Sequence, residues 1–255
     1  MPAPKPRVMQ EIARAQFRSF AVRISGESLA TLIPSRRATP PAANTGPEEA
    51  LLRQCEEFID GICEAICSAW DQWQRQAALV GVMIEGAVAS GGRVLSPRWE
   101  PLLLAGAPKG TVWAQKRSAA IAGALGAAWA QYQASISVPG LPWYPSFAAV
   151  AGPVAPRTRN DPSPLAALTQ TTAPLSRLRL QNQMVAGLQD RASLCEWEVF
   201  AAIAAAFERC FWRWCHSTLV TRVVGSGPVP AYSPPEVPAG PVVGGAGNMI
   251  PGGFV

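Results

Sequence analysis

Charged side chains are scarce in this sequence. They make up 15% of its 255 residues, well below the usual quarter, whereas 49% of the residues are hydrophobic. Lysine occurs only at Lys5, Lys109 and Lys116, so arginine supplies almost all of the net charge of +5. So little charge excludes a charge-rich disordered chain and argues against an ordinary soluble enzyme.

Histidine is almost absent, since His216 is the only one. A Ser-His-Asp or Cys-His mechanism would have to use it, but it follows an Arg- and Trp-rich helix end, where it is expected to cap the last carbonyl groups. There is no P-loop and no GxGxxG. GGAGNMIPGG resembles a glycine loop only in composition, because we expect no strand before it and no helix after it. We therefore expect no catalytic residue, no cofactor and no enzymatic activity.

A CxxC pair is also missing, although the chain has six cysteines. A metal site would need two pairs to meet, for example Cys63 and Cys67 with Cys215 and His216, without the tight knuckle that zinc sites normally have. Free cysteine in a helix is more often a small buried hydrophobe, which is the expected role. A disulfide is the main alternative, and the absence of an apolar signal segment before Arg14 favours reduced thiols.

No charged side chain lies between Ser118 and Pro156, so a membrane span has to be considered there. The segment is mostly Ala and Gly, carries Gln131 and Gln133 and is broken at Pro139, Pro142 and Pro145. Nucleic-acid binding is not expected either, because the N-terminal arginines are not accompanied by an RNA-binding or zinc-finger signature. We expect neither a membrane nor a nucleic acid as partner.

One helical pattern recurs three times without a gap. With Trp70, Trp129 and Phe211 as reference positions, large apolar side chains recur at offsets −8, −4 and +3, and an apolar one at +9. Residues three or four apart share a helix face, and a repeated buried stripe is typical of units that pack on one another. Chance is the alternative, because any amphipathic helix has such a stripe. The expected packing residues are Ile62, Ile66, Trp70, Trp73, Ile121, Leu125, Trp129, Tyr132, Ile203, Phe207, Phe211 and Trp214.

The predicted fold is mainly α with short β segments: three repeated units of helix, aromatic pair and extended run, joined by long Pro/Gly-rich loops. The three repeat helices are expected at about 48–76, 111–135 and 193–216, with a further helix at 174–188. Residues 17–26 alternate like a strand, Ser28 could cap a helical turn at 28–33, and 97–111 reads as a loop. After the first helix we expect short strands broken at Gly86 and at Gly91–Gly92. The predicted divisions are an arm and linker at 1–47, units at 48–112, 113–173 and 174–222, and a tail at 223–255.

Glycine and proline, with 22 and 25 residues, make up about 18% of the chain, against roughly 12% in an average protein. Long apolar loops of this kind need a surface to lie on, and burial in an assembly would provide it. VPGLPWYPSF looks like an extended segment laid into a groove, and arginine is the usual choice for carboxylates at interfaces. The expected partner contacts are Trp143, Tyr144, Phe147, Arg14, Arg18 and Phe254.

A resemblance adds to this interpretation over roughly residues 60–255. AWDQWQ and LVGVMIEG together with GLPWYPSFAAVAGPVAP, and the ending GPVPAYSPPEVPAGPVVGG…IPGGFV, resemble structural proteins of tailed-phage virions and contractile injection machines. The resemblance implies a non-enzymatic structural or adaptor component near a baseplate, spike or neck, in a particle assembled in the bacterial cytoplasm. Its partners would be other structural proteins, around a threefold or sixfold axis. The alternatives are an effector or enzyme with a helical body, and a peripheral membrane protein.

Overall fold

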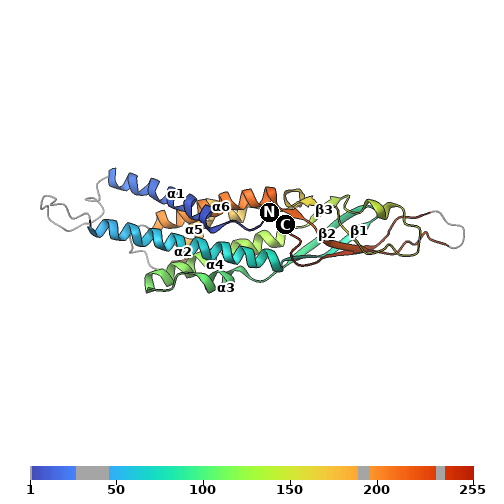
Figure 1. Ribbon diagram of the computed structural model, residues 1–255, viewed down its shortest axis with the longest axis horizontal. Helices are drawn as coiled ribbons and strands as arrows, with labels where there is room; N and C mark the ends of the chain where they lie inside the picture. The colour runs from blue at the N-terminus through green and yellow to red at the C-terminus, as the bar shows by residue number, and fades with distance from the viewer. Residues whose placement is uncertain (1, 27–45, 189–195, 234–238) are drawn as a thin grey trace.

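The computed structural model describes residues 2–26, 46–188, 196–233 and 239–255. The molecule is elongated, with a bundle of helices at one end and extended strands at the other (Figure 1). Both ends of the chain lie where the two parts meet. The prediction of a mainly helical fold with short β segments agrees broadly with this mixed architecture.

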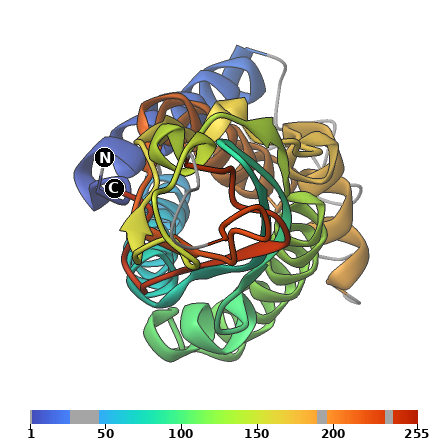
Figure 2. The same cartoon turned by 90° about the vertical axis from the view of Figure 1, so that its right-hand side faces the viewer.

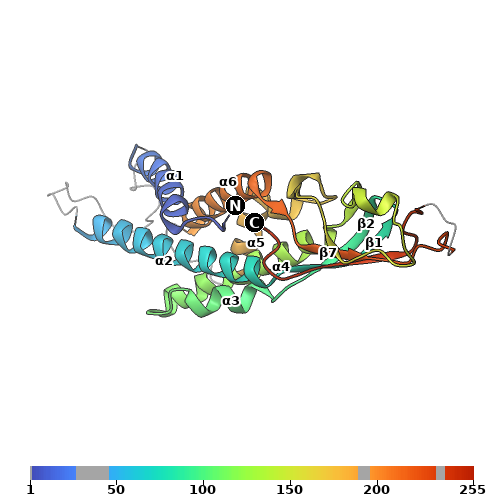
Figure 3. The same cartoon turned by 45° about the vertical axis from the view of Figure 1, so that its right-hand side comes forward.

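Three long helices form the centre of the bundle: α2 (Gly46–Gln76), α4 (Val112–Ser135) and α6 (Glu196–Ser217). They run side by side in the same direction, toward the strands (Figure 3). Three shorter helices run the other way: α1 (Pro6–Gly26), α3 (Trp99–Gly106) and α5 (Arg177–Gly187). Each shorter helix packs between two long ones, α1 on α2 and α6, α3 on α2 and α4, and α5 on α4 and α6.

The long helices begin and end close to where the sequence predicts. Thr111 is the N-cap of α4, and its side-chain oxygen accepts a hydrogen bond from the backbone N–H of Ala114 at 3.1 Å. Among the described helices, none is long and apolar enough to cross a membrane.

Two segments predicted as strand and loop are helical. Residues 17–26, predicted as a strand, belong to α1, because Met9, Ala13 and Phe17 recur every four residues and are all buried at 1% exposure or less. Residues 99–106, inside the predicted loop, form α3, whose Trp99 and Leu103 are buried against α2 and α4. In both cases the packing of one helix face outweighs a weak local pattern. The turn predicted at 28–33 lies outside the described residues.

Six antiparallel strands form one sheet in the order β3-β2-β1-β8-β7-β4. Their bounds are Ala78–Glu85 (β1), Val88–Leu95 (β2), Val138–Leu141 (β3), Thr158–Arg159 (β4), Val223–Ser226 (β7) and Gly245–Met249 (β8). The strands lie around a common axis instead of in a flat layer (Figure 2). Next to the two edge strands, the Asp161 N–H donates a hydrogen bond to the Trp143 carbonyl oxygen at 2.9 Å. A separate pair joins β5 (Ser163–Pro164) to β6 (Leu219–Val220).

One further prediction about strands is wrong. The predicted break at Gly91–Gly92 does not occur, because β2 continues through both glycines, which take φ angles of 68° and 82°. GGAGNM, expected to have no strand before it and no helix after it, itself contributes β8, which pairs with β1 and β7. The predicted break at Gly86 is the turn between β1 and β2.

The inside of the strand region is filled by large side chains opposite glycines. A Cβ atom at Gly225 would lie 2.4 Å from Ile84 and 2.9 Å from Tyr144, and one at Gly245 would lie 2.8 Å from Val242. These positions need glycine because the neighbouring side chains occupy the space. The glycine-rich C-terminal segment is therefore part of the core that the strands enclose.

Candidate functional site

All twelve predicted packing residues lie in the core, each with at most 1% of its surface exposed. They come from α2, α4 and α6 and meet where these helices approach the strands. The three reference aromatics contact one another: ring centroids are 5.1 Å apart for Trp70–Trp129, 6.4 Å for Trp70–Phe211 and 6.2 Å for Trp129–Phe211. The core of the bundle is thus an aromatic triangle with one corner from each long helix.

The aromatic residues three positions later continue this arrangement in a fixed direction. Trp73 packs on Trp129 with centroids 5.0 Å apart, Tyr132 on Phe211 at 5.0 Å, and Trp214 on Trp70 at 5.3 Å. All three contacts are edge-on, with interplanar angles of 87°, 88° and 71°. Each long helix therefore contacts the next one in the same way, and the series closes.

Hydrogen bonds from these aromatics follow the same order. The indole N–H of Trp73 donates to Gln133 on α4 at 3.0 Å, and that of Trp214 donates to Gln74 on α2 at 3.1 Å. Gln74 and Gln133 each follow an aromatic of their own helix by one residue. On α6 this position is Cys215, and the Tyr132 hydroxyl donates instead to Gln170, which contacts the Cys215 sulfur.

The backbone beyond the helices also recurs at equal offsets. α2, α4 and α6 each end six residues after their reference aromatic, at Gln76, Ser135 and Ser217. Five residues further on the backbone turns into the left-handed region, with φ of 69° at Gly81, 99° at Gly140 and 60° at Arg222. Arg222 is the one residue other than glycine with a positive φ among those the structure describes.

The pairing of the strands is cyclic as well. The first strand after α2, β1, pairs with β8, which is the strand that returns after α6. The first full strand after α6, β7, pairs with β4, which returns after α4. The strand after α4, β3, pairs with β2, which returns after α2.

Five of the cysteines, at 55, 63, 67, 210 and 215, are buried, and Cys195 lies outside the described residues. Cys63, Cys67, Cys210 and Cys215 are free thiols. Burial raises the pKa of Cys67 to about 12 and that of Cys210 to about 11, and raises that of Cys63 well above its ordinary value. Within the described ranges no three His, Cys, Asp or Glu side chains are placed to hold a metal ion. The cysteines are thus placed as small apolar residues of the core.

His216 lies in the last turn of α6, as predicted. Its Nδ1 is 2.8 Å from the carbonyl oxygen of Trp212, whose ring lies beside the imidazole with centroids 5.5 Å apart. This geometry is that of a side chain interacting with carbonyl groups at a helix end.

The predicted partner contacts lie within the chain itself. Trp143, Tyr144, Phe147 and Phe254 are at most 2% exposed, and Phe254 stacks on Trp73 at 5.6 Å. The segment VPGLPWYPSF contributes β3 to the sheet of its own chain, and its Tyr144 hydroxyl donates a hydrogen bond to the Val223 carbonyl oxygen at 2.8 Å. These four aromatics therefore have no surface to offer a partner, because the chain's own strands and helices already cover them.

The two predicted arginines join α1 to α2. Arg14 forms an ion pair with Asp60, and Arg18 with Glu56 at 2.7 Å. Hydrogen bonding to Arg18 lowers the pKa of Glu56. Both guanidinium groups bind carboxylates of the same chain, so these arginines join two helices of one molecule.

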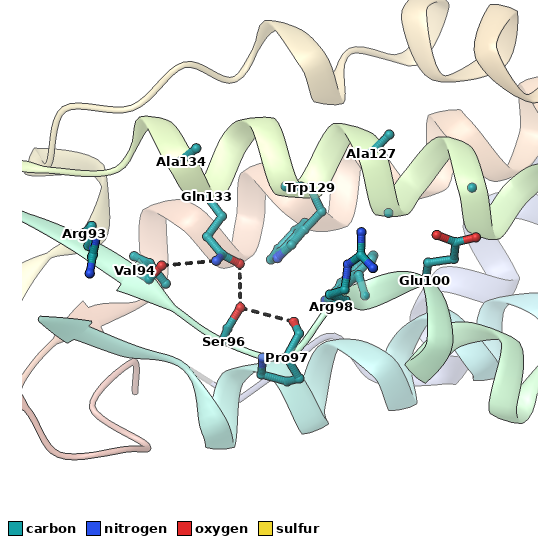
Figure 4. Close-up of a pocket in the computed structure, with 14 residues that line it drawn as sticks. Arg93, Val94, Ser96, Pro97, Arg98, Glu100, Ala127, Trp129, Gln133 and Ala134 are labelled. Atoms are coloured by element: carbon teal, nitrogen blue, oxygen red, sulfur yellow. Dashed lines mark hydrogen bonds between the residues drawn. The ribbon is translucent and has the colours of Figure 1, made fainter.

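A groove that the sequence analysis missed runs beside α4 and has a volume of about 470 Å³ (Figure 4). Its lower wall runs from Arg93 to Glu100, from the end of β2 through the connection to the start of α3, and its floor is α4 from Gly123 to Ala134. Ser96 and Gln133 meet across it, with the Ser96 hydroxyl 2.5 Å from Gln133 Oε1. The small residues at 123, 126, 127, 130 and 134 share one face of α4, and this spacing was the signal available in the sequence.

No protein-family model, no curated protein and no solved structure matches this chain. The contacts of its own residues therefore carry the functional argument.

Proposed function

We propose that the chain is a non-enzymatic structural component that carries three units of one design, arranged about an approximate internal threefold axis. Each unit consists of a shorter helix, a long helix antiparallel to it, and strands that lead away from the bundle and back to it. The observation that carries the proposal is the closed cycle of edge-on aromatic contacts, Trp73 on Trp129, Tyr132 on Phe211 and Trp214 on Trp70. The cyclic strand pairing and the repeated positive φ support it independently.

A single chain of this design would place three units around its long axis. It can therefore lie on the symmetry axis of an assembly whose other subunits are related by threefold or sixfold rotation, where it contacts three equivalent neighbours. The elongated shape, with strands extending away from the helices (Figure 1), suits an axial spike or adaptor. A phage virion or contractile tail, as the sequence resemblance implies, is the proposed setting.

The proposal is tested by the number of copies in the native particle. Quantitative mass spectrometry of particles purified from the source cells should find one copy of this chain for every three or six copies of a neighbouring ring subunit. Cross-linking should join equivalent surface positions of all three units to the same partner. A soluble monomer that never co-purifies with a particle, or a copy number equal to that of a ring subunit, would contradict the proposed role.

A further inference from the structure

We propose that the groove beside α4 binds an extended acidic segment of a partner protein, with carboxylates facing Arg93 and Arg98. The assignment of this segment to a neighbour in an assembly rests on the proposed function. The groove and its charges are independent of that function. The groove lies on one side of the molecule, between α4 and the connection from β2 to α3.

The shape of the groove fits an extended peptide. The helix residues that line it run from Gly123 to Ala134, a separation of eleven residues, or about 16 Å at 1.5 Å per residue. About five residues of extended chain cover that length at 3.3 Å each. A Cβ atom at Gly123 would have no neighbour within 4 Å, and Ala127 and Ala130 are exposed, so the floor is open at these three positions.

The charges along the groove favour carboxylates. Arg93 stands near the end marked by Ala134, and Arg98 reaches toward α4 near Ala127 (Figure 4). Neither guanidinium group forms a recorded ion pair within the described part of the chain. Arginine binds carboxylates with two parallel hydrogen bonds, which gives both affinity and orientation. Glu100 lies beyond Arg98, and its negative charge disfavours an acidic residue of the peptide at that end of the groove.

One further donor beside the groove lacks a partner. The indole N–H of Trp129, a residue that is 1% exposed, has no hydrogen-bond partner among the described residues, and its ring projects from α4 toward Ser96 and Pro97 (Figure 4). α3 begins there with Arg98 as its N-cap and no side-chain capping bond. A helix N-terminus without a capping side chain attracts anions, so the indole N–H, this helix end and the two arginines all favour an acidic ligand.

The test is calorimetric titration of the full chain with an acetylated and amidated decapeptide of alternating Glu and Ala. The matched probe has Gln in place of Glu. We expect saturable binding of the acidic peptide, at least tenfold weaker in the Arg93→Glu/Arg98→Glu double variant and in Ala130→Trp, which fills the floor. Arg209→Glu, which reverses an exposed charge on α6, should change the affinity less than twofold.

Three results would overturn the proposal. The first is equal binding of the Glu and Gln peptides, and the second is an equal effect of Arg209→Glu, which would indicate non-specific attraction. The third is arginine-dependent binding of free glutarate with the affinity of the peptide, which would make the groove a small-anion site. If the chain binds the acidic peptide but is absent from any particle, the proposed function is refuted and the peptide-binding groove is not. Failure of the proposed function can therefore be distinguished from failure of the groove proposal.

Discussion

The backbone at Gly81, Gly140 and Arg222 shows how one local requirement is met by different residues. All three take a left-handed conformation eleven residues after a reference aromatic. Glycine does so without steric cost, whereas a residue with a Cβ atom loses about 1–2 kcal/mol in this region. The strain at Arg222 is retained because the strand pairs of Val220 and Val223 fix the backbone on both sides.

The first prediction follows from that conformation. Gly81→Ala should lower the free energy of unfolding by about 1–2 kcal/mol, because a Cβ atom there would meet no other atom within 4 Å and only the backbone conformation is penalised. Arg222→Gly should leave stability within about 0.5 kcal/mol of the parent, since relief of strain offsets the added chain entropy. Chemical denaturation measures both values.

Gly123→Ala is the matched control. Gly123 also has open space around it, but it lies inside α4 with ordinary helical dihedrals, so alanine should stabilise the protein by about 0.5–1 kcal/mol. A loss at Arg222→Gly as large as that at Gly81→Ala would show that the arginine side chain, and not the backbone, matters at that position.

The buried thiols give a second prediction. Since burial raises the pKa values of Cys67 and Cys210 to about 12 and 11, the unfolded chain ionises first as the pH rises. Their contribution to stability is therefore complete below about pH 9, the ordinary thiol value, and is lost as the pH rises toward 11 to 12. Thermal melts between pH 8 and pH 11 should show this fall, and it should be shallower in Cys67→Ala than in the parent.

Reactivity with a thiol reagent checks the same assignment. At pH 8 the native protein should leave Cys63, Cys67 and Cys210 unmodified, and denaturant should expose them. Rapid labelling of Cys67 in the native state would contradict its burial, because the described structure leaves it only 3% exposed.

At the scale of single elements, α1 is attached to the bundle by two kinds of contact with very different strength. Met9, Ala13 and Phe17 are buried, whereas the ion pairs of Arg14 and Arg18 are partly exposed to solvent. Exposed ion pairs contribute little because water screens them and long side chains must be ordered. The apolar face should therefore hold α1, and the ion pairs should select its position along α2.

A third prediction separates the two contributions. Phe17→Ala should lower the free energy of unfolding by about 3–5 kcal/mol, and Arg18→Ala should lower it far less, because water screens an exposed ion pair. Urea unfolding followed by circular dichroism measures both. If Arg18→Ala were as costly as Phe17→Ala, the ion pair with Glu56 would have to be the main attachment of the helix.

The same elements show what the sequence could and could not predict. α2 and α6 carry a strong periodic stripe and α4 has a clear cap at Thr111, so the positions of the long helices follow from local information. Residues 17–26 of α1 and the whole of α3 were assigned wrongly because their burial depends on helices far away in the sequence. The groove beside α4 was missed because Arg93 comes from the end of β2 and Arg98 from the connection to α3, and only the fold brings these arginines next to α4.

At the scale of the whole molecule, no unit of the proposed repeat can bury its own apolar face. Each shorter helix packs on the long helices of two units, and every unit's first strand pairs with a strand of a neighbouring unit. The aromatic triangle likewise needs all three corners. Loss of one unit would expose the buried faces of the other two, so stability should be a property of the complete cycle.

Cooperative unfolding is therefore the fourth prediction. Far-ultraviolet circular dichroism and tryptophan fluorescence should report one coincident transition, with equal calorimetric and van't Hoff enthalpies. Truncations at Trp129→Ala and Phe211→Ala should each cost about 3–5 kcal/mol and should shift that single transition without splitting it. Two transitions, or a stable fragment that retains α2 and α4 after proteolysis removes α6, would mean that the three units are separate packing bodies and that the closed cycle does not organise the molecule.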